Sequence, residues 1–354
     1  MRVPLRFPPR TPSQRRAFRI LGFAIGFLAL GQLVASCLLD TPRLLGARFP
    51  QIEEQIAAMR ARGGPPDILF LGSSRFEGGV QAWLVEKIVR DELGVEIRAF
   101  NAAVSAGDPL AFDRQLREFL AAGVLPRNLI VEVSPETVAR RIPFFDIDIV
   151  RQLTLPEIVE IAVRDRRTAR FHVLAACRLI PVYKHRQHFW RAAGIPMAAQ
   201  QAPAPGADPP KQRDIEASAR AMTKWLSGYD SNGVATRRLR RLLGACRAAG
   251  IQVTLLGVPV SSPHRRAYTA PVDAGFLRLM AELSAEFGCR YADFRSRVPD
   301  AQFADNHHVD GNGAVAFTRM LASEVAVPLI RDGVRVPRPE SAGRSRSRDA
   351  SFPP

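Results

Sequence analysis

The feature that most constrains this chain is a long apolar run near its N-terminus. Residues 20–39 read ILGFAIGFLALGQLVASCLL, with the amide of Gln32 as the main polar group and no charged side chain. At about 1.5 Å per residue, a helix of this length matches the roughly 30 Å hydrocarbon core of a bilayer. A helix in the core of a soluble domain would keep polar positions on one face, and this run has no such face. We therefore expect residues 20–39 to cross a membrane and to contact its lipids.

The charges before the run predict its orientation. Residues 1–19 carry six arginines and no acidic side chain, and positive segments stay on the cytoplasmic side. We expect a cytoplasmic N-terminus, an anchor in a bacterial inner membrane, and a main domain in the periplasm or outside the cell. A second fate of the run stays open. The segment VASC at 34–37 resembles a lipobox, in which Cys37 would be lipidated after cleavage.

The bulk composition excludes other classes of protein. The formal charge is +16, from 50 Lys and Arg against 34 Asp and Glu, and such a chain can attract nucleic acid, anionic lipid or acidic polysaccharide. No basic stripe alternates with aromatic residues and no zinc-finger spacing occurs, so we expect no nucleic-acid partner. The four cysteines form no C-x-x-C pair. We therefore expect neither a metal nor a cofactor.

Beyond the run, strand-like and helix-like segments alternate. A membrane-proximal helix and linker are expected over 40–66. The expected strands are 67–71, 95–100, 129–133, 253–258 and 289–294. The expected helices are 81–93, 108–122, 235–249, 274–287 and 313–325. This alternation predicts an α/β fold with a parallel sheet of about five strands.

Two segments interrupt the alternation. Residues 138–232 have a helical, basic pattern and include a Pro-rich piece at 200–214, so we interpret them as an insertion near the active-site edge of the sheet. Residues 331–354 are rich in Arg, Ser and Pro, and we expect a disordered tail there. Residues 67–330 then form one domain that contains the insertion.

Two serines follow the first expected strand, in the segment LFLGSSR at 69–75. Catalytic groups of a parallel α/β sheet gather at the carboxyl ends of its strands, where helix N-termini favour negative charge. Ser73 or Ser74 could equally cap the helix that follows. This segment alone does not distinguish a nucleophile from a helix cap.

A histidine-containing turn precedes the last helix. Residues 303–314 read FADNHHVDGNGA. Asp305 and His308 are three residues apart, so in one turn both side chains can face the same side, and the carboxylate can orient the imidazole as a base. His307 is the competing base. Opposite a serine at a strand end, this pattern favours a catalytic site over exposed turn histidines.

Together the motifs resemble those of the SGNH (GDSL-type) hydrolases, over about residues 67–137 and 232–325. The matching positions are Gly72, Ser74, Asp305, His308 and Gly313. The resemblance implies a flavodoxin-like three-layer sandwich. Ser73 stands where the first motif usually has Asp, which is similar to envelope branches such as the teichoic-acid D-alanine transfer and alginate acetylation proteins.

The resemblance also implies roles for these residues. Ser74 would be the nucleophile, His308 the base and Asp305 the carboxylate that orients it, with Ser73 and His307 as the alternatives. The family's oxyanion donors are less well matched. The backbone N–H groups of Ser74 and of one further residue would serve.

The second motif, FNAAVSAG at 100–107, keeps Asn101 but has Ala103 where the family usually has an oxyanion Gly. The third motif, G-x-N-D, is absent, and the third strand runs into Ser134. Ala103, through its backbone N–H, and Ser134, as a weak substitute, are therefore the expected donors. The loss of one such donor costs about 100-fold or more in rate.

Two functions stay open. The first is a membrane-anchored serine esterase or O-acyltransferase that acts on acyl esters of cell-envelope glycans through an acyl-serine intermediate. Its substrate would be an acylated glycan or a small ester. The second is a non-catalytic SGNH-like envelope protein that binds glycan or a membrane acyltransferase partner, which the absent third motif favours. Whether the chain is an enzyme stays open at this point.

Overall fold

A five-stranded parallel sheet forms the centre of the molecule. The computed structural model describes residues 11–39, 50–139 and 212–334, with the single positions 156, 159 and 180. The strands are β1 (Ile68–Leu71), β2 (Ala99–Asn101), β3 (Asn128–Val133), β4 (Gln252–Gly257) and β5 (Arg290–Asp293). They lie in the order β2-β1-β3-β4-β5, all parallel. This is the flavodoxin-like strand order, and the predicted fold class is confirmed.

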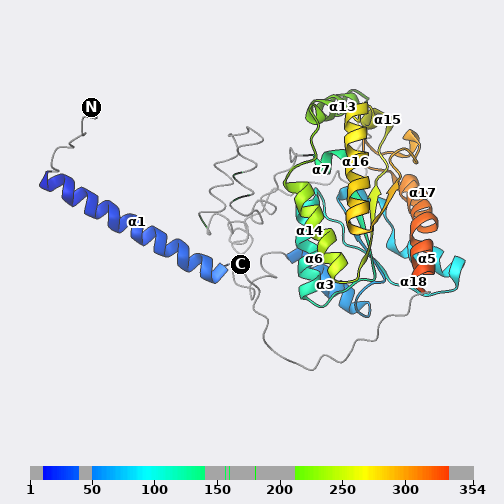
Figure 1. Cartoon of the computed structure of the whole chain (residues 1–354), viewed down its shortest axis with the longest axis horizontal. Helices are drawn as coiled ribbons and strands as arrows, with labels where there is room; N and C mark the ends of the chain where they lie inside the picture. Colours follow the sequence, from blue (N-terminus) through cyan, green and yellow to red (C-terminus); the bar gives the residue numbers. More distant parts are fainter. Residues whose placement is uncertain are drawn as a thin grey trace.

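Helices cover both faces of this sheet (Figure 1). One face carries α3 (Pro50–Ala61), α6 (Pro109–Ala121), α14 (Val234–Ala248) and α16 (Ala270–Phe287). The other face carries α4 (Ser74–Gly79), α5 (Ala82–Leu93), α17 (Gly311–Leu321) and α18 (Val327–Val334), with a π-helical turn at Ala322–Ala326 between the last two. Successive strand residues point to opposite faces. In β1, Leu69 and Leu71 therefore join the first core, and Ile68 and Phe70 join the second.

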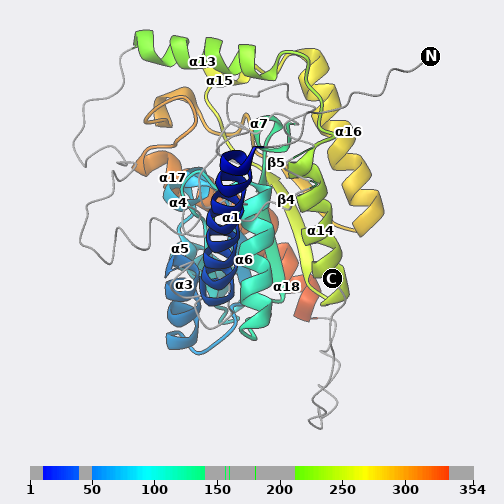
Figure 2. The same cartoon turned by 90° about the vertical axis from the view of Figure 1, so that its left-hand side faces the viewer.

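The strand ends that form the site meet at one edge of the sheet. Val133 of β3 pairs in register with Gly257 of β4, and Phe70 of β1 pairs with Asn101 of β2. The short helices α7 (Pro135–Val138) and α15 (Ser262–Arg265) follow β3 and β4 at this carboxyl edge. Helix α13 (Gln212–Leu226) packs against both, across the top of the domain in Figure 2.

The N-terminal helix α1 (Pro12–Leu39) contains the apolar run and begins earlier than the run does. Most of its described side chains are exposed; Phe23 and Phe27 are 81% and 80% exposed. Pro12–Ala35 is long and apolar enough to cross a membrane, and its place near the N-terminus fits an anchor or a signal sequence. A second apolar stretch, Gly311–Gly333, is 61% buried and belongs to the core of the domain.

Some predicted boundaries differ from those observed. The strand expected over 95–100 is confined to β2, because β1 pairs with it only from Ala99 onward. The tail expected from 331 overlaps the end of α18, which continues to Val334 and packs against α5. Most of the predicted insertion at 138–232 and the rest of the tail lie outside the described residues. The domain limits therefore stay predictions.

Candidate active site

The turn after β1 gives its two serines different environments. Ser73 is buried and caps α4, since its hydroxyl oxygen accepts the N–H of Arg75 at 3.2 Å. Ser74 is the first residue of α4 and is half-buried. Gly72 allows the turn, because a methyl group there would overlap the ring of Phe76. The helix cap is therefore Ser73, and the hydroxyl of Ser74 is available to another partner.

That partner is a histidine from the far end of the chain. The Oγ atom of Ser74 lies 2.8 Å from Nε2 of His308. On the other side of the ring, Nδ1 of His308 lies 2.7 Å from Oδ2 of Asp305. An ionised carboxylate only accepts, so Nδ1 donates to it and Nε2 is left to accept the Ser74 proton. The structure thus brings together the three residues whose spacing and order suggested a catalytic site.

The turn that holds Asp305 is locally determined. Its Oδ1 atom accepts the backbone N–H groups of His307 and His308, at 2.8 and 2.7 Å. A β-bridge between Phe303 and Val309 closes the turn. Because Asp305 and His308 sit in one closed turn, the carboxylate and the imidazole are oriented by neighbouring backbone.

The electrostatics of this turn separate the two histidines. Burial alone would raise the pKa of the Asp305 carboxyl, but the hydrogen bond from His308 and the neighbouring His307 outweigh it and hold that pKa well below its usual range. Burial, followed by the nearby His308, lowers the pKa of His307 to about 3. His307 is therefore neutral at physiological pH. The Ser74 hydroxyl donates its hydrogen bond to His308, and His307 packs on the ring of His308 with centroids 4.2 Å apart.

In the second motif, Asn101 connects β2 to α4 and also accepts the backbone N–H of Ala103. The N–H of Ala103 donates to Oδ1 of Asn101 at 3.1 Å, and Ala103 is 6% exposed. The amide of Asn101 in turn donates to the carbonyls of Phe76 and Val80, at 2.8 and 2.9 Å. Asn101 therefore ties the end of β2 to α4, and the expected donor at Ala103 is engaged by Asn101.

The expected substitute donor at the end of β3 is engaged as well. Ser134 is buried and lies at the N-cap of α7, where its hydroxyl bonds Thr137 at 3.2 Å. It also accepts a hydrogen bond from the guanidinium of Arg75 at 3.0 Å. The short helix α7 begins where a third motif would lie, and the Ser134 hydroxyl caps it. The hydroxyl is therefore not free to serve as an oxyanion donor.

The loop after β2 contains a residue that the sequence reasoning missed. Ala106 has a φ of 57°, in the left-handed region that favours glycine. The turn is closed by the N–H of Gly107 on the carbonyl of Val104, and the N–H of Val104 bonds the carbonyl of Gly72, both at 2.9 Å. Within the part of the chain that the structure describes, no acceptor for the N–H of Ala106 is found. The glycine in V-S-A-G indicates a turn here, but the residue types do not show which position has the positive φ.

A second missed feature is a buried ion cluster behind Ser73, made of Arg75, Glu132 and Glu136. Glu132 is fully buried, and its two oxygens accept the N–H and the hydroxyl of Ser73 at 2.7 and 2.8 Å. Arg75 donates to Glu132 at 2.8 Å and to Glu136 at 2.6 Å. Glu136 also accepts the hydroxyl of Tyr268 at 2.8 Å. A carboxylate inside the apolar strand pattern LIVEV was the signal, because a buried charge requires a partner.

The described residues contain one group compact enough to hold a metal ion, Asp305, His307 and His308. The oxygens of Asp305 are already engaged by the His308 ring and by two backbone N–H groups. A metal would have to displace these hydrogen bonds. The arrangement therefore fits proton transfer better than metal binding.

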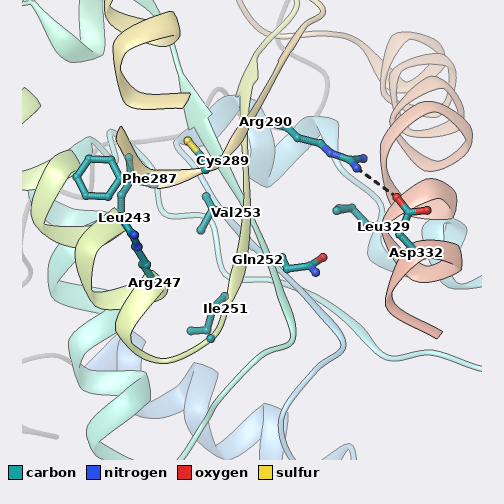
Figure 3. A pocket seen from close by; sticks show the side chains of 12 residues that line it. Leu243, Arg247, Ile251, Gln252, Val253, Phe287, Cys289, Arg290, Leu329 and Asp332 are labelled. Carbon is teal, nitrogen blue, oxygen red and sulfur yellow. Dashed lines mark hydrogen bonds and ion pairs between the residues drawn. The ribbon is translucent and has the colours of Figure 1, made fainter. Parts of the chain in front are cut away.

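A separate hollow of about 390 Å³ lies at the opposite edge of the sheet, at the amino ends of β4 and β5 (Figure 3). Gln252 and Cys289 are among the residues that line it, and an ion pair between Arg290 and Asp332, at 3.2 Å, lies at one side. Since Ser74 follows the carboxyl end of β1, this hollow is not part of the candidate active site.

No protein-family model and no curated protein matches the sequence. Several solved structures are similar to this one. One is a GDSL-like lipase from Bacteroides thetaiotaomicron, with 11% identity and a TM-score of 0.35; the match covers 80% of this chain and 96% of that chain. An esterase from a Pseudoalteromonas species has 12% identity, coverage of 76% and 98%, and a TM-score of 0.38. A catalytic mutant of an acetylxylan esterase from Geobacillus stearothermophilus has 12% identity, coverage of 74% and 94%, and a TM-score of 0.38. At such identities and TM-scores, the activity of this chain has to be argued from its own geometry.

Proposed function

We propose that the chain is an SGNH-like serine esterase or O-acyltransferase. The observation that carries this proposal is the continuous hydrogen-bonded series Ser74–His308–Asp305 at the carboxyl edge of the sheet. A serine hydroxyl becomes nucleophilic when a positioned base takes its proton, and a carboxylate on the far nitrogen stabilises the imidazolium that forms.

The reaction follows from this geometry. Nε2 of His308 takes the proton as Oγ of Ser74 attacks the ester carbonyl, and the C–O bond to the alcohol breaks as His308 returns the proton to that alcohol. The acyl group is then held on Ser74. His308 next deprotonates water or a second hydroxyl, which attacks the acyl-serine and releases it. The N–H groups of Ser74 and Ala106 are the proposed oxyanion donors, because Ala103 and Ser134 are engaged elsewhere.

We further propose that α1 is a bilayer anchor that holds the domain on the outer side of a bacterial inner membrane. The exposed apolar side chains of α1 and the arginines before its apolar run support this orientation. Cys37 is an exposed free thiol, so lipidation remains the alternative fate. Labelling with a radioactive fatty acid separates the two, since a signal-anchor protein incorporates no label and a lipoprotein loses its label in Cys37→Ala.

The acceptor that best fits this location is a hydroxyl of an envelope glycan, with a small ester as the minimal substrate. Supplying an added disaccharide together with a chromogenic acetyl ester tests this. A transferase forms acetylated sugar at the expense of free acetate, whereas an esterase forms acetate alone.

The second candidate function is a non-catalytic module that binds glycan or a membrane acyltransferase. The engaged Ala103 and Ser134 favour it, because they leave fewer free donors for an oxyanion than the family pattern has.

A fluorophosphonate probe followed by peptide mapping decides between these two functions. We expect the full-length protein in detergent to be labelled at Ser74, and we expect both labelling and ester turnover to be lost in Ser74→Ala. Ser323→Ala is the matched control, because Ser323 is an exposed serine whose partner is Glu92. A wild type that neither labels nor turns over acetyl and butyryl esters supports the binding module instead.

A further inference from the structure

Resting on the proposed function, we infer that Arg75 is a positioning residue for this reaction. It neutralises Glu132 and Glu136, so that Glu132 can hold the Ser73–Ser74 turn without opposing the negative charge that the reaction builds beside Ser74.

The first step of the argument is how tightly Glu132 holds the turn. Its carboxylate accepts the backbone N–H of Ser73 at 2.7 Å and the Ser73 hydroxyl at 2.8 Å. Ser73 in turn begins α4, since its oxygens accept the N–H groups of Arg75 and Phe76 at 3.2 and 3.0 Å. The direction of the neighbouring Ser74 hydroxyl and N–H therefore depends on a buried carboxylate.

The second step is the charge that this arrangement places next to the nucleophile. Glu132 is fully buried and Glu136 is 5% exposed, and a single guanidinium, that of Arg75, contacts both. Burial lowers the pKa of Arg75, but the two carboxylates outweigh it and raise that pKa above its usual value. An oxyanion forming at Ser74 would meet unscreened negative charge if the guanidinium were absent.

The third step is that no other described group takes the place of Arg75 on Glu132. Among the described residues, the hydrogen bonds that Glu132 accepts come from Ser73 and Arg75. The remaining titratable or charged groups lie around Glu136 or farther out. These groups are Tyr229, His264, Tyr268, Arg295 and His307.

This role predicts a specific dependence on pH. In Arg75→Met, the two buried carboxylates lose the guanidinium, and burial without a counter-ion raises the pKa of a carboxyl. At low pH such a group is protonated and neutral, and at high pH it is charged. The activity of Arg75→Met relative to wild type should therefore fall as the pH rises. A purely structural loss would have the same size at every pH.

The experiment measures kcat and KM for a chromogenic acetyl ester, and the rate of fluorophosphonate labelling, between pH 6 and 9 with the full-length protein. We expect kcat of Arg75→Met to be lower by about 10- to 100-fold at pH 9, with KM within about threefold, and a clearly smaller loss at pH 6. Arg75→Lys keeps the charge, so its loss should not grow with pH. The matched control is Arg238→Met, which removes another buried arginine, paired with Asp113 at 3.0 Å on the α6–α14 side. Its kcat should stay near wild type at every pH.

A double variant keeps the inference testable if Arg75→Met fails to fold. Arg75→Met/Glu132→Gln removes the guanidinium together with the carboxylate on Ser73, and the added dependence on pH should be largely lost. An equal loss of kcat at all pH values in Arg75→Met, or an undiminished dependence in the double variant, overturns the inference. These outcomes leave the proposed function intact if wild type is active and Ser74→Ala is not. A wild type that neither labels nor turns over overturns both.

Discussion

Replacement of Asp305 by Asn tests the candidate site most directly, because it changes one atom and retains the shape of the side chain. In the native turn, Oδ2 accepts the Nδ1–H of His308 at 2.7 Å, and Oδ1 accepts two backbone N–H groups. The asparagine oxygen can keep the two N–H groups, which leaves its NH2 facing Nδ1. Nδ1 must then accept, so the proton moves to Nε2, and Nε2 can no longer take the proton of Ser74.

The expected loss follows from this change of tautomer. Where a carboxylate of this kind has been replaced by its amide, kcat falls by about 10⁴, equivalent to ~5 kcal/mol of transition-state stabilisation. Stability should change little, because the turn keeps its backbone hydrogen bonds. The assay is hydrolysis of a chromogenic acetyl ester at pH 8, with thermal unfolding measured in parallel and His307→Ala as the control. A kcat within tenfold of wild type for a folded Asp305→Asn would refute the proposed role of Asp305.

Three further predictions concern stability. Gly313→Ala should lower the free energy of unfolding by about 1–3 kcal/mol, because the added methyl group would overlap the backbone carbonyl of Gln302. Gly311→Ala is the control, since there is open space at that position and the variant should not be destabilised. Urea titration measures both variants, and equal effects would contradict the packing argument. Ala106→Gly should raise stability by about 1 kcal/mol, because φ is 57° there, and an unchanged urea midpoint would be evidence against backbone strain. The pKa of His307 falls from 6.5 to about 3 on folding, so the unfolded state binds more protons between these values and stability is lost as the pH drops through that window. The melting temperature of wild type should therefore fall more steeply from pH 6.5 to 4 than that of His307→Phe. Equal slopes would contradict the lowered pKa of His307 in the folded protein.

Much of the sheet could be predicted, because buried parallel strands are short apolar runs that end at polar turns. The strand expected over 129–133, for example, is β3 at Asn128–Val133. The spacing of Asp305 and His308 likewise predicts that both belong to one turn. The choice of Ser74 over Ser73 required the distant histidine, which strand order places at the same edge.

The donor side of the site could not be predicted from the residue types. The direction of a backbone N–H depends on the conformation of the turn. Ala103 and Ala106 are the same residue type, so the sequence does not distinguish them. In the structure one of them donates to Asn101, while the other has a positive φ and no acceptor among the described residues. The role of Glu132 was equally hidden, because Arg75 and Glu132 are 57 positions apart in the chain and their pairing is purely tertiary.

The separation between α1 and the domain has a consequence for specificity. Helix α1 ends at Leu39 and α3 begins at Pro50, so ten residues join them. Ten residues reach at most about 36 Å. With α1 in the bilayer, as proposed, Ser74 works within a thin layer along the membrane surface. A polymer that crosses or lies on the membrane surface would encounter Ser74 repeatedly. An ester in solution would encounter the tethered enzyme no more often than it would encounter an untethered one. Under this proposal, the anchor favours substrates that lie at the membrane surface, in addition to any selection by the side chains around Ser74.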